Sequence, residues 1–307
     1  MDKNYQQLNY NNRVVVVTGA GIGLGKAYAI YFAKRGAKVI VNDLGTSQNG
    51  AGSSSQVADE VVSQIKSFGG TAIADYNSVE FGEKVIQTAI DNYGRIDILI
   101  NNAGILRDKT FRNMTHQDWD FIMKIHLTSV FITTKAAYTF MVKQNYGRIV
   151  NVSSPSGLYG SFGQANYSCA KAGIIGLSSA LSKESEKNNI FVNVICPIAA
   201  TRMTETIFSS DILDTLKVDY VVPLVAYLCH ESSKETGSIF EVGGRWIAKV
   251  RWNRSEGVVF DKKFDVEDVK ERFNEIIDFG KSCFPVDNMS ALKIISTIKE
   301  KDLITKF

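Results

Sequence analysis

Three side chains in the second half of the sequence are of the types that move a proton at a secondary alcohol. Tyr167 and Lys171, in the sequence YSCAK, are four residues apart and would share one face of a helix. A phenol has a pKa of about 10, so it is a weak base at neutral pH unless a cation such as Lys171 stabilises its phenolate. Ser154, at the expected end of a strand, would hold the substrate oxygen. The alternative is a solvated Tyr–Lys pair on a surface helix.

A hydride removed from such an alcohol needs an acceptor, and residues 13–25 (RVVVVTGAGIGLG) predict a dinucleotide site. The apolar run predicts a buried strand, and Lys26–Lys34 predicts the helix that follows it. Glycines between them let a pyrophosphate approach bare backbone at a helix N-terminus. The spacing is TGxxxGxG rather than GxGxxG, and alone it is equally typical of a turn that binds nothing. The expected cofactor contacts in this turn are Gly19, Ile22, Gly23, Leu24 and Gly25.

An acidic residue follows the second predicted strand, Lys38–Asn42, and it indicates which dinucleotide is bound. Asp43 lies 24 residues after Gly19, where this fold needs a carboxylate for the adenosine ribose 2′-OH. A carboxylate accepts hydrogen bonds from a diol and repels a 2′-phosphate, and Leu44 and the other neighbours offer no cation. The sequence therefore predicts NAD rather than NADP as the cofactor. The alternative is that Asp43 is a simple turn residue. The loop Gly45–Ser55 is expected to lie near the adenine.

Small and amide residues follow two further predicted strands, Thr71–Asp75 and Asp97–Ile100. The second strand is followed at once by Asn101–Gly104 (NNAG), which suits a backbone-facing cofactor contact but is also typical of a plain turn. Ligands of parallel sheets lie beyond the carboxyl ends of the strands, where these residues fall. The remaining cofactor contacts that we expect are Asn77, Ser78, Val79, Asn102, Ala103, Gly104, Tyr167 and Lys171.

Strands alternate with helices along most of the chain. This pattern predicts a doubly wound, Rossmann-like α/β fold with a seven-stranded parallel sheet and helices on both faces, plus a C-terminal extension. We expect residues 1–12 to be a polar tail, 13–244 the NAD-binding domain and 245–307 the extension. Other expected elements are strands at Gly147–Ser153 and Ser238–Val242 and helices at Ser55–Phe68, Glu80–Asn92 and Thr115–Lys143.

The composition is ordinary for a globular protein, with 307 residues, 45% of them hydrophobic and 22% charged. A net charge of +3 is too small to indicate nucleic acid as a partner, and no apolar run approaches membrane-spanning length. The first twelve residues are polar and lack the apolar core of a signal peptide. The four cysteines are scattered without a CxxC motif, so we expect reduced thiols and no metal site.

In combination, TGAGIGLG, NNAG, Ser154 and YSCAK resemble the short-chain dehydrogenase/reductase family over roughly residues 13–244. Further motifs are similar to the (3R)-hydroxyacyl-CoA dehydrogenase units of type 2 peroxisomal multifunctional enzymes, a group that includes 17-beta-hydroxysteroid dehydrogenase type 4-like proteins. These motifs are VNDLG (41–45), NNAGILRD (101–108), GSFGQANYS (160–168), LCHES (228–232) and FEVGGRWIAKVRW (240–252).

The resemblance implies NAD-dependent oxidation of a (3R)-3-hydroxyacyl-CoA to the 3-ketoacyl-CoA in fatty-acid β-oxidation. It implies Tyr167 as the base, Lys171 as its electrostatic partner and ribose ligand, and Ser154 as donor to the substrate oxygen. It also implies a homodimer and, in a longer parent chain, a linked hydratase or sterol-carrier domain. A peroxisomal location follows by resemblance, but the chain ends in ITKF rather than an SKL-type signal, so a cytoplasmic location is the alternative.

One departure from the family pattern concerns His126, which stands where many members carry an asparagine that holds a water for proton relay. Histidine can also pass protons, so we assign His126 to the relay, a structural histidine being the alternative. Two other functions stay open. One is oxidation of a steroid or another secondary alcohol, which assays with acyl-CoA and sterols would separate. The other is a protein that senses NAD without turnover, which any hydride transfer would exclude.

The extension begins with a basic cluster, RWIAKVRWNR (245–254), that contains no acid. We assign Arg251 and Arg254 to the phosphates of coenzyme A, because guanidinium groups bind phosphate through two hydrogen bonds. The alternative is a solvated basic strand. Val266–Phe279 predicts an amphipathic helix, which by resemblance would pack partly on the other subunit of a homodimer.

Overall fold

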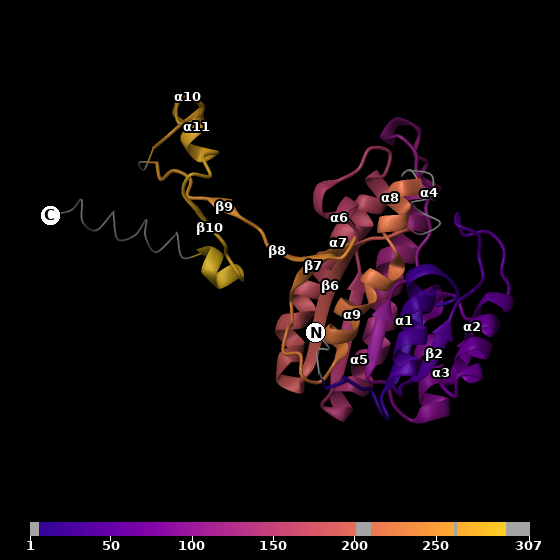
Figure 1. Ribbon diagram of the computed structural model, residues 1–307. Coiled ribbons are helices and arrows are strands. Elements are labelled where there is room, and N and C mark those ends of the chain that lie inside the picture. The colour runs from indigo at the N-terminus through magenta and orange to yellow at the C-terminus, as the bar shows by residue number, and fades with distance from the viewer. Residues whose placement is uncertain (1–5, 201–209, 261–262, 293–307) are drawn as a thin grey trace. The chain divides into compact units, whose positions relative to one another are not determined.

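The apolar runs of the sequence form the strands of one sheet in the computed structural model, which describes residues 6–200, 210–260 and 263–292. The chain divides into an N-terminal unit, Met1–Lys249, and a C-terminal unit, Val250–Phe307 (Figure 1). In the sheet the strands run in the order β3-β2-β1-β4-β5-β6-β7-β8, and β1 to β7 pair in parallel. The strands are β1 (Val14–Thr18), β2 (Lys38–Asn42), β3 (Thr71–Asp75), β4 (Ile98–Asn101), β5 (Gly147–Val152), β6 (Ile190–Ile198), β7 (Ile239–Gly243) and β8 (Trp246–Val250).

The sheet has eight strands among the described residues, so the prediction of seven was wrong. β7 and β8 are joined by Gly244 and Arg245, whose φ angles of 54° and 68° are both left-handed. A two-residue turn with two positive φ angles is a type I′ hairpin, which joins antiparallel strands. β8 lies within residues 245–254, for which a solvated basic strand was the alternative to a coenzyme A contact, and it is mostly exposed at the sheet edge.

Helices cover both faces of the sheet, as the alternation along β1 shows. Val15 and Val17 join one apolar cluster with α1, α2 and α9, whereas Val14 and Val16 join a second cluster with α3 and α5. The predicted doubly wound α/β fold is therefore confirmed. The helices of this unit are α1 (Gly23–Lys34), α2 (Gln56–Ser67), α3 (Gly82–Tyr93), α4 (His116–Met123), α5 (Ser129–Gln144), α6 (Pro155–Tyr159), α7 (Ala165–Ser185), α8 (Ser210–Thr215) and α9 (Val222–Cys229).

The helix expected over Thr115–Lys143 is interrupted, which corrects that prediction. Its start is as expected, because the Thr115 hydroxyl accepts from the backbone N–H of Asp118 at 3.1 Å and the Asp118 carboxylate accepts from the Thr115 N–H at 3.2 Å. Between α4 and α5, however, Lys124–Thr128 forms a π-helical turn. Such turns are frequent at functional sites, and this one contains His126.

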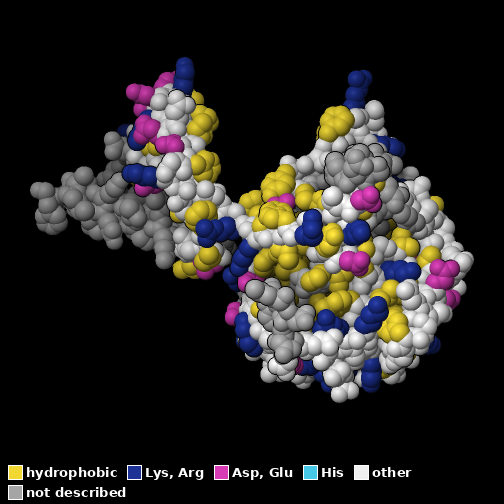
Figure 2. Space-filling view, viewed as in Figure 1, with side chains coloured by type: hydrophobic (Ala, Val, Ile, Leu, Met, Phe, Trp, Pro, Cys, Tyr) yellow, Lys and Arg dark blue, Asp and Glu magenta, His cyan; other side chains and the backbone are white. Residues whose placement is uncertain are grey.

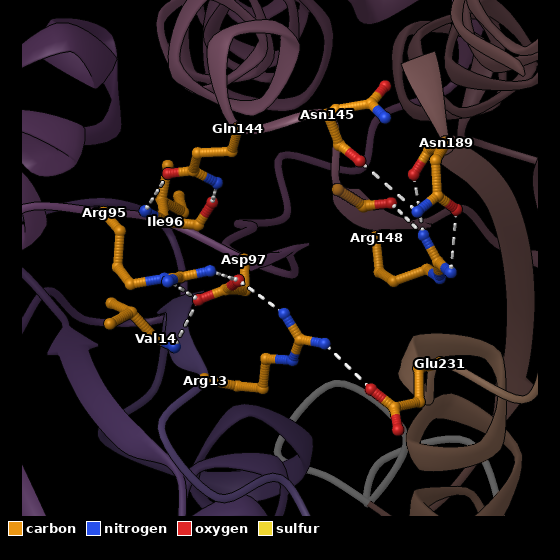
Figure 3. A network of polar contacts seen from close by, with 11 residues as sticks. Arg13, Val14, Arg95, Ile96, Asp97, Gln144, Asn145, Arg148, Asn189 and Glu231 are labelled. Atoms are coloured by element: carbon orange, nitrogen blue, oxygen red, sulfur yellow. Dashed lines mark hydrogen bonds and ion pairs between the residues drawn. The ribbon is translucent and has the colours of Figure 1, made fainter. Parts of the chain in front are cut away.

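A network of charged side chains gathers at the amino ends of the strands (Figure 3). The buried Asp97 carboxylate accepts from Arg13 at 3.1 Å, from Arg95 at 2.6 Å and from the Val14 N–H at 2.9 Å. Arg148 is also buried, with its guanidinium over the ring of Tyr146, and burial lowers its pKa. The network therefore joins β1, β4 and β5 at the edge of the sheet opposite their carboxyl ends.

The C-terminal unit contains β9 (Arg254–Ser255), β10 (Ser282–Cys283), α10 (Val266–Glu271) and α11 (Phe273–Ile276), and β9 pairs antiparallel with β10. The helix predicted over Val266–Phe279 is thus broken at Arg272. None of the described residues from Trp252 onward is buried, and apolar side chains lie openly on this unit (Figure 2). The described residues of this unit form no buried core for the apolar helix face to pack on, and short helices are marginal without such support. No described helix of the chain could span a bilayer.

Candidate active site

A cavity of about 590 Å³ opens at the carboxyl ends of the strands, a volume in the range of small-molecule sites. It brings together most of the residues that the sequence assigned to cofactor and catalysis. These are Gly19, Ile22, Gly23, Leu24, Asp43, Asn77, Ser78, Val79, Asn102, Ala103, Gly104, His126, Ser154, Tyr167 and Lys171.

Three assigned residues are placed elsewhere. Gly25 does not line the cavity but lies beneath the turn, where a Cβ atom would come within 2.0 Å of the Gly19 carbonyl oxygen. Its bare backbone therefore lets the first turn of α1 pack against the preceding loop. Arg251 and Arg254 belong to the C-terminal unit, where Arg251 lies over the ring of Phe284 and Arg254 donates to the Ala291 carbonyl. Their contact with coenzyme A stays a prediction.

The glycine turn fits a pyrophosphate group. α1 begins at Gly23, three residues earlier than expected, and its N-cap residue Ile22 provides no side-chain hydrogen bond to the helix. The first turn also lacks an acidic side chain, so its N–H groups and the positive end of the helix dipole remain available to an anion. Gly19 has a φ of +63°, and a Cβ there would lie 2.8 Å from the Cα of Ala103. The turn therefore needs glycine for both its conformation and its close packing.

Asp43 is fixed at the cavity by two backbone groups. Its Oδ2 accepts from the Gly21 N–H at 2.8 Å, and its Oδ1 accepts from the Gly45 N–H at 2.7 Å. The carboxylate thereby joins the glycine turn to the loop after β2. Each carboxylate oxygen can accept a second hydrogen bond, so Asp43 can still receive the hydroxyl groups of a ribose.

Asn42 is a contributor that the sequence analysis missed. Its side-chain amide donates to the Asp75 carboxylate at 2.7 Å and to the Asn77 carbonyl at 2.8 Å. Asp75 also accepts from the side chain of Asn77 at 2.7 Å, so the backbone and side chain of Asn77 are both held at the cavity. A polar residue closing an otherwise apolar strand was the available signal.

Asn102 supports the glycine turn from the neighbouring strand. Its side-chain amide donates to the carbonyl oxygens of Thr18 at 3.0 Å and Gly19 at 3.1 Å. The Thr18 hydroxyl accepts in return from the backbone N–H groups of Asn102 and Ala103. The NNAG segment thus holds the phosphate-binding turn in shape while Asn102 and Ala103 line the cavity.

The loop between Gly45 and Ser55 crosses toward the segment after β4. The Leu106 N–H donates to the Gln48 carbonyl at 3.0 Å, and a Cβ on Gly50 would lie 2.8 Å from the ring of Phe121. Residues of this loop line the cavity together with Ile105 and Phe121. The loop therefore forms part of the cavity wall.

Ser154 and Tyr167 meet at the catalytic end of the cavity. Ser154 follows β5 and is the N-cap of α6, its hydroxyl oxygen accepting from the Ser156 N–H at 3.1 Å. Burial raises the pKa of Tyr167 to about 12, although its hydrogen bond with Ser154 acts in the opposite direction. Both residues line the cavity in which an alcohol would be held, as proton transfer to Tyr167 requires.

Lys171 lies on the same face of α7 as Tyr167, with its Nζ 5.5 Å from the centre of the Tyr167 ring. The Nζ donates to the Val152 carbonyl at 2.7 Å, and burial lowers the pKa of Lys171 to about 7. The sequence analysis treated Lys171 as a permanent cation. In this structure its charge is expected to titrate near neutral pH, because the ammonium is desolvated.

His126 is buried, and it contacts Tyr167 edge-to-face with ring centres 5.0 Å apart. Its Nε2 lies 3.1 Å from the Ile105 N–H nitrogen and 2.7 Å from the Ile105 carbonyl, whereas Nδ1 has no partner among the described residues. Burial and the nearby Lys171 lower the pKa of His126 well below its usual range. Its imidazole is therefore neutral at physiological pH, and its Nδ1 is buried without a hydrogen-bond partner among the described residues.

The cavity also has lining residues that the sequence analysis did not assign to it individually. Most follow strands or belong to the segment after β4, and most have apolar or small side chains that gave no chemical signal. They are Asn42, Leu44, Thr46, Ser47, Gln48, Gly50, Glu80, Ile105, Phe121, Ile125, Val152, Ser153, Pro197, Ala199, Ala200 and Val218.

Comparison with known proteins gives consistent matches. Residues 13–211 match the family model described as short chain dehydrogenase. The chain is 50% identical to peroxisomal multifunctional enzyme A of Dictyostelium discoideum, over 96% of this chain and 67% of that protein. It is 52% identical to peroxisomal multifunctional enzyme type 2 of Mus musculus, over 91% of this chain but only 38% of that protein. The solved structure of the full-length type 2 enzyme from Drosophila melanogaster has a TM-score of 0.83 and 41% identity, covering 96% of this chain and 50% of that one.

Proposed function

The chain belongs to the short-chain dehydrogenase family, and from this premise we propose that it oxidises (3R)-3-hydroxyacyl-CoA to 3-ketoacyl-CoA with NAD, as in fatty-acid β-oxidation. The observation that carries the proposal is the meeting of Ser154, Tyr167 and Lys171 in the cavity that also contains the glycine turn. The choice of substrate rests on the similarity to peroxisomal multifunctional enzymes, which extends beyond the family model into the C-terminal unit.

In the proposed reaction Ser154 donates a hydrogen bond to the substrate oxygen, and the Tyr167 phenolate accepts the hydroxyl proton. The alcohol carbon loses its hydrogen as hydride to the acceptor that bound NAD supplies, so the carbon–oxygen single bond becomes a carbonyl. Protonated Lys171 stabilises the phenolate, and its proximity to Tyr167 on α7 supports that role. His126, with a neutral ring and an unpaired nitrogen, is proposed to relay the proton through a water.

The residues present fit a nicotinamide dinucleotide. The uncapped start of α1 would hold the pyrophosphate, and Asp43 would hold the adenosine ribose. Asn77 follows β3 and Asn102 follows β4, the strands on either side of the β2–β1 pair, and each is fixed by neighbouring polar groups. Lys171 would bind the second ribose beside the reacting ring.

We expect NAD to be preferred over NADP by at least about tenfold in kcat/KM, because about 1.4 kcal/mol of repulsion between Asp43 and a 2′-phosphate gives that ratio. The two backbone hydrogen bonds of Asp43 prevent it from turning away. Steady-state kinetics with both cofactors measure the ratio, and Asp43→Asn should narrow it. Asp91→Asn, an exposed change on α3, is the control and should leave the ratio unaltered. Similar kcat/KM values for NAD and NADP in the natural protein would disprove the role of Asp43.

The setting of the reaction is also proposed by similarity. The chain spans 38% of the mouse enzyme and half of the solved Drosophila chain, so these relatives have further segments. We propose a peroxisomal location, a homodimer, and association with a hydratase or sterol-carrier domain in a longer parent chain.

The deciding experiment for the reaction is NADH production by the full chain with (3R)- and (3S)-3-hydroxyacyl-CoA in parallel. Turnover of the (3R) substrate alone supports the proposal. Turnover of free sterols without acyl-CoA activity would favour a steroid dehydrogenase. Binding of NADH with no turnover of either class would instead indicate a sensor.

A further inference from the structure

Two hydrogen bonds running in opposite directions connect the end of β5 to the middle of α7. The Lys171 ammonium donates to the Val152 carbonyl at 2.7 Å. One residue further along the chain, the Ser153 hydroxyl donates to the Lys171 carbonyl at 2.8 Å. Ser153 and Lys171 are both buried, with 2% and 3% of their surfaces exposed. The strand therefore holds the backbone of Lys171 through one bond and its side chain through the other.

Ser153 is itself firmly placed. Its N–H donates to the Ile195 carbonyl of β6 at 2.7 Å, so the residue is part of the sheet. On another side, a Cβ on Gly157 of α6 would lie 2.8 Å from the carbonyl carbon of Lys171, so the two helices are in direct backbone contact there. Lys171 is thus enclosed by the sheet and α6, and a displacement of Ser153 would pass directly to it.

The hydrogen bond from the Ser153 hydroxyl is not needed to give the Lys171 carbonyl of α7 a partner. The carbonyl of Lys171 lies well inside a helix of 21 residues, where an N–H four residues later already bonds to it. A second donor adds little to the formation of the helix, but it fixes the position of this one turn relative to β5. That turn is the one that presents Lys171 to Tyr167.

We propose that Ser153 is a positioning residue, which holds Lys171 at the distance from which its ammonium stabilises the Tyr167 phenolate. This inference rests on the proposed dehydrogenase function. Ser153 does not contact the reacting atoms in this role, which it exerts through Lys171. It is distinct from Ser154, which lines the cavity together with Tyr167 and would meet the substrate.

Other titratable groups also face this pair of residues. Cys196 of β6 lies near Lys171 and Ser153, His126 approaches from the π-helical turn, and Asp108 acts on Tyr167 from the segment after β4. Burial keeps the Cys196 thiol protonated, because it raises the pKa of that group to about 11, and His126 is neutral. Asp108 opposes ionisation of Tyr167, so ionisation depends more strongly on the distance between Tyr167 and Lys171.

The test is the pH dependence of NADH production by Ser153→Ala in the full chain. We expect kcat to fall roughly fivefold, the equivalent of one ordinary hydrogen bond, with little change in the KM for acyl-CoA. If the Lys171 ammonium is held less closely, the pKa of Tyr167 in the active enzyme rises. The part of the pH profile in which activity increases should therefore move to higher pH. Ser153→Thr, which retains the hydroxyl, should restore the natural profile.

Ser182→Ala is the matched control. Ser182 lies on the same helix, is 2% exposed, and its hydroxyl also donates to a helix carbonyl, that of Ser179 at 2.8 Å. It should lower the melting temperature by a similar amount without moving the pH profile. A Ser153→Ala profile that overlays the natural one, in an active enzyme, would overturn the positioning role. Absence of acyl-CoA turnover in the natural protein would instead disprove the proposed function.

Discussion

Replacement of Tyr167 by phenylalanine is expected to reduce turnover by roughly a thousandfold, within the range that a positioned general base contributes. The substitution removes only the hydroxyl group that would accept the substrate proton, while the ring keeps its contact with His126. NADH binding, followed by fluorescence titration, should remain nearly unchanged. A variant that retains a tenth of the natural activity would remove Tyr167 from the role of base.

Tyr28→Phe provides the matched control for this experiment. Tyr28 is fully buried in α1, and its hydroxyl has no hydrogen-bond partner in the described structure, so its removal should change neither kcat nor NADH binding. The natural enzyme should also oxidise its substrate faster as pH rises toward neutrality, above which Lys171 loses the charge that stabilises the phenolate. Burial raises the pKa of Tyr167 to about 12, and only the deprotonated form can accept a proton. Tyr167→Phe should lose this pH dependence together with the activity.

Removal of the C-terminal segment is expected to abolish acyl-CoA turnover while NAD binding persists. A chain ending at Gly244 would also lose β8, so its behaviour would mix damage to the sheet with loss of the C-terminal unit. A chain ending at Val250 keeps all eight strands of the main sheet and is the sharper test. It lacks Arg251 and Arg254, the residues assigned to the phosphates of coenzyme A.

For the chain ending at Val250 we expect NADH binding within about twofold of the full chain and at least a hundredfold loss of kcat/KM for acyl-CoA, a difference of about 2.7 kcal/mol. Size-exclusion chromatography would show whether its dimer is lost as well. If this shortened chain turns over acyl-CoA at the full rate, the C-terminal unit is not needed for the reaction. The assignment of Arg251 and Arg254 to the phosphates of coenzyme A would then be wrong.

The parts of the site that could be predicted from sequence are those with local chemical signals. A glycine turn, an acid after β2 and the Tyr167–Lys171 spacing each have meaning within a few residues, and the fold brings them to one cavity. Strands buried on both faces, such as β2, were located by their apolar runs. β8 was not counted in the sheet because it is mostly exposed and its segment, residues 245–254, was assigned first to coenzyme A.

Other features depend on contacts between distant segments, which local patterns do not contain. The π-helical turn at His126 interrupts a sequence that is helical throughout. The lowered pKa of Lys171 results from burial between β5, α6 and α7, so the residue type alone suggested a permanent cation. Ser153 looked like part of a strand end, and its bond to Lys171 becomes visible only when β5 and α7 are side by side.

The charged network at the amino ends of the strands makes this fold suitable for engineering in two independent parts. Asp97 and Arg148 lie at the start of β4 and β5, whereas Ser154 and the cavity lie past the other end of β5. Strands of this length span roughly 17 Å, and substitutions more than about 10 Å apart usually have additive effects on stability. Substitutions at the amino ends of the strands can therefore be selected for heat resistance. They can then be combined with cavity substitutions selected for a new alcohol substrate, and neither group of substitutions has to be optimised again.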